Sequence, residues 1–153
     1  MAIYYYSGPV RSGKTSRLSE WVKHHTEAGG ILTPDVGDKR MILNINTNEY
    51  IAFECSDHEE LEKIQVGRFH FLTSSFRKGN EIISDSFHKR TWTILDEWGK
   101  LEMEGRGFMP EINNILNQAV RTEDRHVLVV VRDYLLESFL LRFPESEPMV
   151  FLS

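Results

Sequence analysis

Residues 8–15 combine two glycines, a lysine and a threonine in the run Gly8-Pro9-Val10-Arg11-Ser12-Gly13-Lys14-Thr15. This run matches the Walker A pattern G-x-x-x-x-G-K-[ST] at every fixed position. Glycines let the backbone curl so that its N–H groups point at phosphate oxygens, and a following helix adds the positive end of its dipole. Lys14 can reach the β- and γ-phosphates, and the Thr15 hydroxyl can ligate Mg²⁺. Together with the adjacent Ser16, these residues predict a binding site for a magnesium nucleoside triphosphate.

Two carboxylates form the second candidate group, because the apolar pair Ile94-Leu95 leads directly into Asp96-Glu97. Parallel strands bring their carboxyl ends to one edge of an α/β sheet, where ligands bind. We therefore expect Asp96 near the Mg²⁺ held at Thr15, in contact through a coordinated water. Glu97 is expected to orient or deprotonate the attacking water. The order of the two groups favours this interpretation over two solvated loop acids.

An arginine often stabilises transition-state charge in phosphoryl transfer. Arg132 is the best-placed candidate, because it ends a predicted strand at the edge where the site is expected. Arg11 lies within the phosphate loop itself. The arginines that are less well placed are Arg106, Arg121 and Arg125.

Strands and helices alternate around these candidate residues. Residues 3–7 predict a buried strand that leads into the phosphate loop. Residues 14–28 predict a helix ended by Gly29 and Gly30, and residues 31–33 predict a second strand. Further strands are predicted at 68–72, 91–95, 126–131 and 149–152, and further helices at 80–88 with Asn80 as N-cap, from Pro110 onward and around 135–140.

This order of elements predicts an α/β fold with a mostly parallel, five-stranded P-loop sheet and helices on both faces. Residues 41–46 and 50–53 flank Thr47-Asn48-Glu49 in the pattern of a β-hairpin. We expect this inserted hairpin to belong to a β-rich segment covering about residues 38–72 of a single domain, residues 1–153.

Composition limits the classes of partner. The 153 residues carry a formal net charge of −5, with 18 Lys and Arg against 23 Asp and Glu, which disfavours a nucleic-acid partner. The longest apolar run, residues 127–131, is too short for a membrane span, and the N-terminus lacks a signal-peptide pattern. A single cysteine, Cys55, fits a reducing compartment, so we expect a cytoplasmic protein. Protein partners are not indicated by any motif.

Several short patches occur in the order typical of a known family. Besides the phosphate loop they are Gly30-Ile31-Leu32-Thr33, Val66-Gly67-Arg68 and Asp96-Glu97-Trp98-Gly99-Lys100-Leu101-Glu102. Over nearly its whole length the chain resembles the small nucleoside-triphosphatases first described from thermophiles, whose most specific element is D-E-x-G-[KP]-x-E. The resemblance implies a RecA-like P-loop fold and Mg²⁺-dependent hydrolysis of several nucleoside triphosphates, such as ATP and GTP. It assigns this chemistry to Lys14, Thr15, Asp96 and Glu97.

Two positions depart from that family pattern. The family commonly carries an arginine in a T-E-E-V-R stretch, whereas here Thr33-Pro34-Asp35-Val36 leads to Gly37. An aliphatic residue is usual where Trp98 stands. No motif for reading a particular base is evident, so we expect weak discrimination among nucleotide bases.

Three functions share these motifs. The leading one is hydrolysis of a nucleoside triphosphate to diphosphate and phosphate, with Lys14 and Glu97 as catalytic residues. A small-molecule or nucleoside kinase would use the same loop, and residues 41–72 could form its acceptor site, although no arginine-rich lid is evident. The third is a nucleotide-dependent binding module whose slow turnover times a partner interaction.

Overall fold

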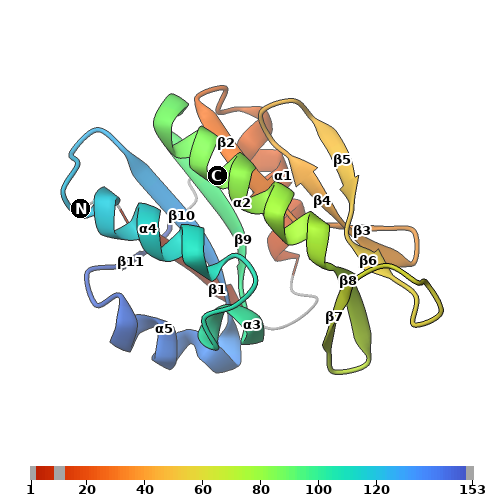
Figure 1. Cartoon of the computed structure of the whole chain (residues 1–153). Helices are drawn as coiled ribbons and strands as arrows, with labels where there is room; N and C mark the ends of the chain where they lie inside the picture. Colours follow the sequence, from red (N-terminus) through yellow and green to blue (C-terminus); the bar gives the residue numbers. More distant parts are fainter. Residues whose placement is uncertain (1–2, 9–12, 151–153) are drawn as a thin grey trace.

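Five parallel strands form the centre of the protein in the computed structural model, which describes residues 3–8 and 13–150 (Figure 1). Their spatial order is β11 (Glu147–Pro148), β1 (Ile3–Gly8), β10 (His126–Arg132), β9 (Trp92–Trp98) and β2 (Ala28–Leu32). The interior of β10 is buried throughout, as expected for a strand covered on both faces. The predicted parallel α/β sheet is therefore confirmed.

Antiparallel strands extend this sheet beyond β2. The strands between residues 35 and 72 are β3 (Asp35–Val36), β4 (Lys39–Asn44), β5 (Glu49–Ala52), β6 (Glu54–Cys55), β7 (Lys63–Val66) and β8 (Phe69–Leu72). β4 pairs with β2, β3 and β5, so the described residues form an eight-stranded sheet rather than a five-stranded one. β6, β8 and β7 form a second, three-stranded sheet. The β4–β5 hairpin agrees with the sequence pattern. Strands β3 and β6 have two residues each, which is too short to produce a recognisable alternation of apolar and polar residues.

Helices cover both faces of the main sheet, as predicted. They are α1 (Lys14–Lys23), α2 (Thr73–Lys89), α3 (Lys100–Met103), α4 (Met109–Ala119) and α5 (Leu136–Arg142), with a 3₁₀ turn η1 (Asp133–Leu135) before α5. Figure 1 shows α2, α4 and α5 in front of the sheet and α1 behind it. Leu18 of α1 packs on Ile94 and Leu128 from behind. No helix among residues 3–8 and 13–150 is long and apolar enough to cross a bilayer.

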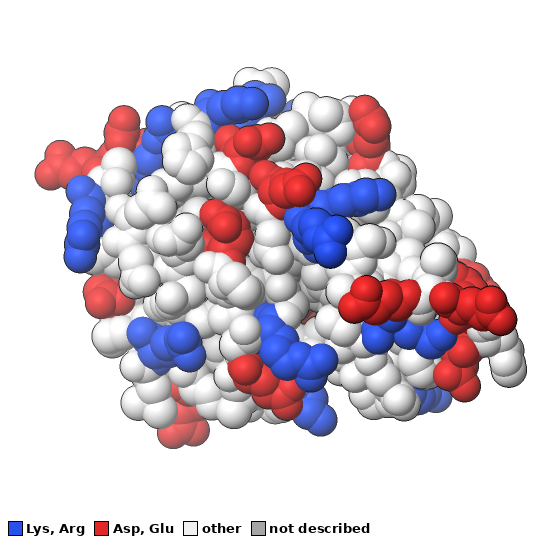
Figure 2. All heavy atoms as spheres, viewed as in Figure 1, with Lys and Arg blue, Asp and Glu red and all other residues white. Residues whose placement is uncertain are grey.

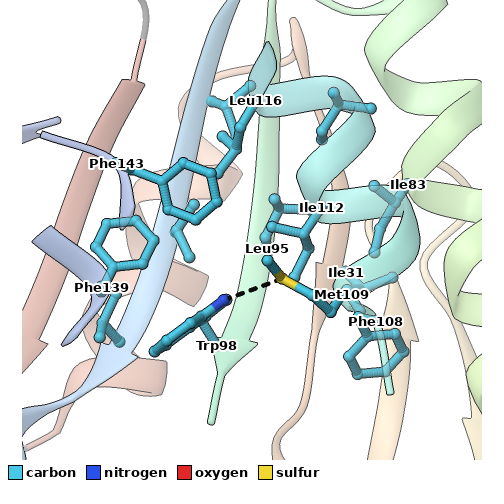
Figure 3. Packing of buried hydrophobic residues seen from close by; sticks show 14 of the residues in the cluster. Ile31, Ile83, Leu95, Trp98, Phe108, Met109, Ile112, Leu116, Phe139 and Phe143 are labelled. Atoms are coloured by element: carbon cyan, nitrogen blue, oxygen red, sulfur yellow. Dashed lines mark hydrogen bonds between the residues drawn. The ribbon is translucent and has the colours of Figure 1, made fainter. Parts of the chain in front are cut away.

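The larger apolar core lies between the sheet and its front helices. Trp98, at the end of β9, is 1% exposed and packs edge-to-face against Phe139 of α5 (Figure 3). Its indole N–H donates to the sulfur of Met109 in α4, at 3.3 Å. Trp98 therefore fills the space between α4 and α5. It anchors the end of β9 directly beyond Asp96 and Glu97.

Two glycines predicted to end the first helix lie inside β2 instead. Helix α1 already ends at Lys23, and β2 begins at Ala28. A Cβ on Gly30 would lie 2.1 Å from the carbonyl oxygen of Ile94, and the φ angle of Gly30 is +105°. Glycine is therefore required here because β2 and β9 approach closely, a demand that no local pattern reveals.

The prediction that Asn80 begins a helix was also wrong. Helix α2 begins at Thr73, and the Asn80 side chain donates to the carbonyl oxygen of Gly107 at 3.2 Å. The last strand, β11, is shorter and earlier than predicted, and residues 151–153 lie outside the described part. The helix predicted at Pro110 is confirmed, with this proline in the first turn of α4.

Charged side chains of both signs are interspersed over the face drawn in Figure 2. On this face Lys and Arg are spread among Asp, Glu and uncharged side chains, and they do not gather into one basic patch. The distribution agrees with the near balance of the two signs in the sequence.

Candidate functional site

The phosphate loop connects β1 to α1 at the carboxyl edge of the sheet. Gly8 ends β1, and Gly13 adopts a left-handed conformation with φ of +84° directly before the helix. Lys14 Nζ donates to the carbonyl oxygen of Gly8 at 2.8 Å, so the lysine side chain spans the loop from its last turn to its first residue. The predicted phosphate ligands Pro9, Val10, Arg11 and Ser12 lie outside the described residues.

The first turn of α1 carries the other residues predicted to bind the nucleotide. Thr15 is half-buried, whereas Ser16 is exposed. The first turn of α1 contains no acidic residue and its N-cap makes no side-chain hydrogen bond, so no side chain of this described turn offsets the positive end of the helix dipole. Such a helix start attracts phosphate oxygens.

Asp96 is buried at the end of β9, with only 3% of its surface exposed. Its Oδ2 accepts a hydrogen bond from the backbone N–H of Thr33, directly after β2, at 3.0 Å. Burial and then the charge of Glu97 raise the pKa of Asp96 to about 6, against the lowering effects of the Thr33 hydrogen bond, Arg40 and Arg132. Burial and a neighbouring negative charge destabilise the ionised form of this carboxylate, and a bound cation would stabilise it.

Glu97 lies at an irregularity between β9 and β10. Val130 pairs with Asp96 but Val131 pairs with Trp98, so Glu97 is an extra residue on its strand. Bulges of this kind often re-aim a side chain next to an active site. Arg132 Nε donates to Glu97 Oε1 at 2.8 Å.

The contact between Glu97 and Arg132 joins the acidic pair to the phosphate loop. Arg132 ends β10 and pairs in register with Gly8, the first residue of the loop. The other arginines considered lie elsewhere: Arg106 pairs with the exposed Glu104, and Arg125 bonds to the carbonyl oxygen of Arg90 before β9. Among the candidate arginines that the structure describes, Arg132 is therefore the one that contacts the acidic pair.

A second arginine at Glu97 was missed by the sequence analysis. Arg40 NH1 lies 3.7 Å from Glu97 Oε1, although Arg40 belongs to β4 of the inserted segment. Arg40 is also the register partner of Asp35 across the β3–β4 hairpin, and its Nε lies 3.5 Å from Asp35 Oδ1. Asp35 and Arg40 lie on either side of Gly37 in the sequence, and this acid and arginine could have indicated a pair across the hairpin. The contact with Glu97 depends on β4 joining the sheet beside β2, for which the sequence has no local signal.

The Glu102 carboxylate stabilises the segment from Gly99 to Phe108, which follows the acidic pair, through backbone hydrogen bonds. Its two carboxylate oxygens accept backbone hydrogen bonds from Gly99 and Phe108, each at 2.9 Å. Burial raises the pKa of Glu102 to about 7, and these hydrogen bonds partly oppose the shift. A Cβ on Gly99 would lie 3.5 Å from Glu102 and 3.7 Å from Glu97. The last acid of the D-E-x-G-x-x-E run therefore shapes the backbone beside Glu97.

The donor set at this edge suits a hard cation. The Thr15 hydroxyl and the Asp96 carboxylate are oxygen donors, the type that Mg²⁺ prefers. Among the described residues, no three His, Cys, Asp or Glu side chains are grouped closely enough to hold a metal by themselves. Mg²⁺ commonly binds through one or two protein oxygens together with substrate phosphates and water, and these residues fit that arrangement.

The match to a known protein family shows which family this chain belongs to. The model of the family described as NTPase matches residues 4–152, almost the full length. The chain belongs to the NTPase family. As a family member it is a nucleoside-triphosphatase, which agrees with the phosphate loop and the acidic pair described above.

Two solved structures share the fold of this NTPase at low sequence identity. The solution structure of a human cancer-related nucleoside triphosphatase is 17% identical with a TM-score of 0.68, covering 100% of this chain and 90% of that one. The crystal structure of THEP1 from the hyperthermophile Aquifex aeolicus is 18% identical with a TM-score of 0.65, covering 97% and 88%. A search among curated proteins gave no match.

Proposed function

We propose that this NTPase cleaves the γ-phosphate from nucleoside triphosphates in a Mg²⁺-dependent reaction, with the carboxyl edge of β1, β9 and β10 as its active site. The observation that carries the proposal is the 2.8 Å contact between Glu97 and Arg132, whose register partner Gly8 begins the phosphate loop. A carboxylate and a guanidinium thus lie beside the loop expected to hold the triphosphate. Both are groups that phosphoryl transfer needs.

Backbone amides and one lysine hold the triphosphate in this proposal. The residues assigned to binding are Gly8, Pro9, Val10, Arg11, Ser12, Gly13, Lys14, Thr15 and Ser16. Lys14 exchanges the carbonyl oxygen of Gly8, its neighbour at 2.8 Å, for phosphate oxygens. That exchange replaces a neutral acceptor with an anionic one, which makes the hydrogen bond stronger.

Thr15 and Asp96 are the residues that would hold Mg²⁺. When bound, the ion neutralises charge on the β- and γ-phosphates. Because Asp96 has a pKa of about 6, it is mostly ionised at neutral pH and ready to bind a cation. The Thr33 N–H holds Asp96 Oδ2 in place, which leaves Oδ1 for the ion or its water.

Glu97 acts on the attacking water. The water oxygen bonds to the γ-phosphorus while the bond from that phosphorus to the β–γ bridging oxygen breaks, leaving its electron pair on the diphosphate. The water proton passes to Glu97, which is 20% exposed and so remains accessible to solvent. Arg132 orients Glu97 and is our candidate for stabilising charge in the transition state.

Phosphate release tests this proposal. Each of the four ribonucleoside triphosphates is incubated with the protein, with Mg²⁺ or excess chelator, and with or without a panel of small-molecule and nucleoside acceptors. We expect release that requires Mg²⁺ and is independent of acceptors. Phosphate transfer that needs one acceptor would indicate a kinase, and tight triphosphate binding with negligible release would indicate a timing module. Full activity in chelator would overturn the proposed metal dependence.

The setting of this reaction is a further part of the proposal. Nucleoside triphosphates are the proposed substrates, without a membrane or nucleic-acid partner. We expect the protein to act in the cytoplasm, where its one cysteine, the buried Cys55, stays reduced. Fractionation of cells that express the protein would test the location.

A further inference from the structure

Two arginines from distant parts of the chain meet at one oxygen of Glu97. Arg132, from the central strand β10, contacts Oε1 at 2.8 Å, and Arg40, from the inserted strand β4, lies 3.7 Å from the same oxygen. Their side chains are 24% and 28% exposed. A bound triphosphate adds several negative charges to an edge that already carries Asp96 and Glu97. One guanidinium is enough to orient Glu97, so the second is suited to another task.

The guanidinium of Arg40 is held loosely. Its distance to Glu97 exceeds that of a hydrogen bond, and within the described residues its terminal nitrogens donate none. Its pair with Asp35 is long, at 3.5 Å, and the Asp35 side chain is 68% exposed. An exposed pair such as that with Asp35 contributes little stability, and the contact with Glu97 is longer than a hydrogen bond, so Arg40 can exchange these acids for a phosphate.

The backbone of Arg40, in contrast, is firmly placed. Its amide donates to Glu54 Oε1 at 3.1 Å. Strand β4 is paired on one side with β2 and β3 and on the other with β5, and Met41 is in register with Ala52. With a fixed backbone and a guanidinium held only by long contacts, Arg40 can move between neighbouring anions without rearrangement of its strand.

We propose that Arg40 is a second catalytic arginine, supplied in cis by the inserted β-segment, which transfers from Glu97 to the γ-phosphoryl oxygens during hydrolysis. This inference rests on the proposed hydrolysis at the same site. As Arg40 leaves Glu97 it stabilises charge on the γ-phosphoryl group and on the bridging oxygen that keeps the electron pair.

Single-turnover phosphate release in variants at position 40 is the first test. Arg40→Ala should slow release by about 100-fold or more, as loss of a transition-state arginine does, while triphosphate affinity changes by less than about threefold. Arg40→Lys keeps the positive charge and the long side chain, so it controls for a folding defect caused by truncation to alanine. It should also lose most of the rate, because an ammonium group cannot replace the planar guanidinium with its several donors. Guanidinium chloride, but not sodium chloride at equal ionic strength, should restore part of the rate to Arg40→Ala.

The matched control is Lys39→Ala. Lys39 is the neighbouring cation on β4, and it pairs with Glu59 at 3.8 Å instead of reaching the acidic pair. This variant should release phosphate at the wild-type rate and should not respond to guanidinium. A wild-type rate in Arg40→Ala would overturn the inference, and so would an equal loss in Lys39→Ala.

A double-mutant cycle separates contact with the phosphate from an effect through Glu97. The probe is ADP with aluminium fluoride, which imitates the transferring phosphoryl group, bound to variants with and without Glu97→Gln. If Arg40 contacts that group, Arg40→Ala should weaken the complex even in the Glu97→Gln background. If the effect disappears there, Arg40 acts only on Glu97 and the inference is wrong. A wild-type protein that releases no phosphate would instead overturn the proposed function, and this inference with it.

Discussion

The neighbouring carboxylates of Asp96 and Glu97 have different surroundings. Asp96 is buried, accepts a backbone hydrogen bond and has a pKa raised to about 6. Glu97 is 20% exposed and lies against Arg132. A buried acid with a raised pKa suits a cation, whereas an oriented acid open to solvent suits a water molecule. Environment therefore separates the roles proposed for two residues that are adjacent in the sequence.

Glu97→Gln should slow single-turnover phosphate release by roughly 100-fold or more while triphosphate affinity stays nearly unchanged. Glutamine keeps a hydrogen-bond acceptor for the water and for Arg132 but lacks the basicity to take a proton. The measurement is rapid-mixing phosphate release from prebound triphosphate, beside a control variant of an exposed acid, Glu104→Gln. Equal rates in wild type and Glu97→Gln would mean that Glu97 is not the base.

Lys14→Ala should weaken triphosphate binding by roughly 10- to 100-fold or more, since hydrogen bonds to charged groups are worth about 1.5–3 kcal/mol. The variant also loses the bond from Lys14 to Gly8 that spans the loop. Titration calorimetry gives the affinity. Lys23→Ala, at the far end of the same helix with a side chain 70% exposed, serves as control. Unchanged affinity in Lys14→Ala would remove this lysine from the site.

At the element scale, the turn from Gly99 to Phe108 links β9 to α4 and depends on one carboxylate. Glu102 accepts the N–H groups at both ends of this turn and is 5% exposed. Asn80 of α2 reaches the same turn through its bond to Gly107. Elements on the front face therefore hold the backbone beside Glu97 in a defined position, which preorganised catalysis requires.

The buried Glu102 should make stability depend on pH. Its pKa is about 7 in the folded protein, above the ordinary 4.5, so the folded protein holds this proton to a higher pH than the unfolded chain. The free energy of unfolding should therefore fall as pH rises from about 5 to 8. In Glu102→Gln this contribution is absent, and the stability of wild type relative to the variant should drop by about 2 kcal/mol over that range. Urea unfolding at several pH values measures it, and parallel curves for the two proteins would contradict the prediction.

At the scale of the whole molecule, the sheet order assembles the site. β10 lies between β1 and β9, so Arg132 meets both the phosphate loop and the acidic pair. β2 lies on the other side of β9 and contributes Thr33, and β4 beside it contributes Arg40. Four neighbouring strands and the insertion thus contribute to one candidate site, and a ligand that binds there should stabilise the entire fold.

Nucleotide binding should raise the unfolding temperature by a similar amount for all four bases. A ligand at 100 times its Kd adds about 2.7 kcal/mol, which corresponds to roughly 5–10 °C for a chain of this size. The phosphates supply the recognisable contacts, so the base should matter little. Thermal unfolding with Mg²⁺ and imido analogues of the four triphosphates tests this. A preference of more than about 100-fold for one base would reveal a specific pocket.

Local patterns in the sequence were sufficient for the parallel sheet, the helices on both faces and the order of the phosphate loop and acidic pair. Apolar periodicity reports which faces become buried, and the motif spacing reports a loop whose geometry is set within a few residues. The roles of Lys14, Thr15, Asp96 and Glu97 stay predictions until the variants are measured.

Contacts between residues that are distant in the sequence depend on how the strands and helices pack. Arg40 reaches Glu97 because β4 pairs beside β2, and Glu102 meets Phe108 because the turn folds back on itself. Gly30 lies in β2 in register with Ile94, whose backbone leaves no room for a side chain there. The residues next to these positions in the sequence do not predict the contacts, because pairing and packing between elements depend on the whole sheet. The motifs were enough to indicate a nucleoside triphosphate as ligand, and the packing of the strands decided which charged side chains lie beside the phosphate loop.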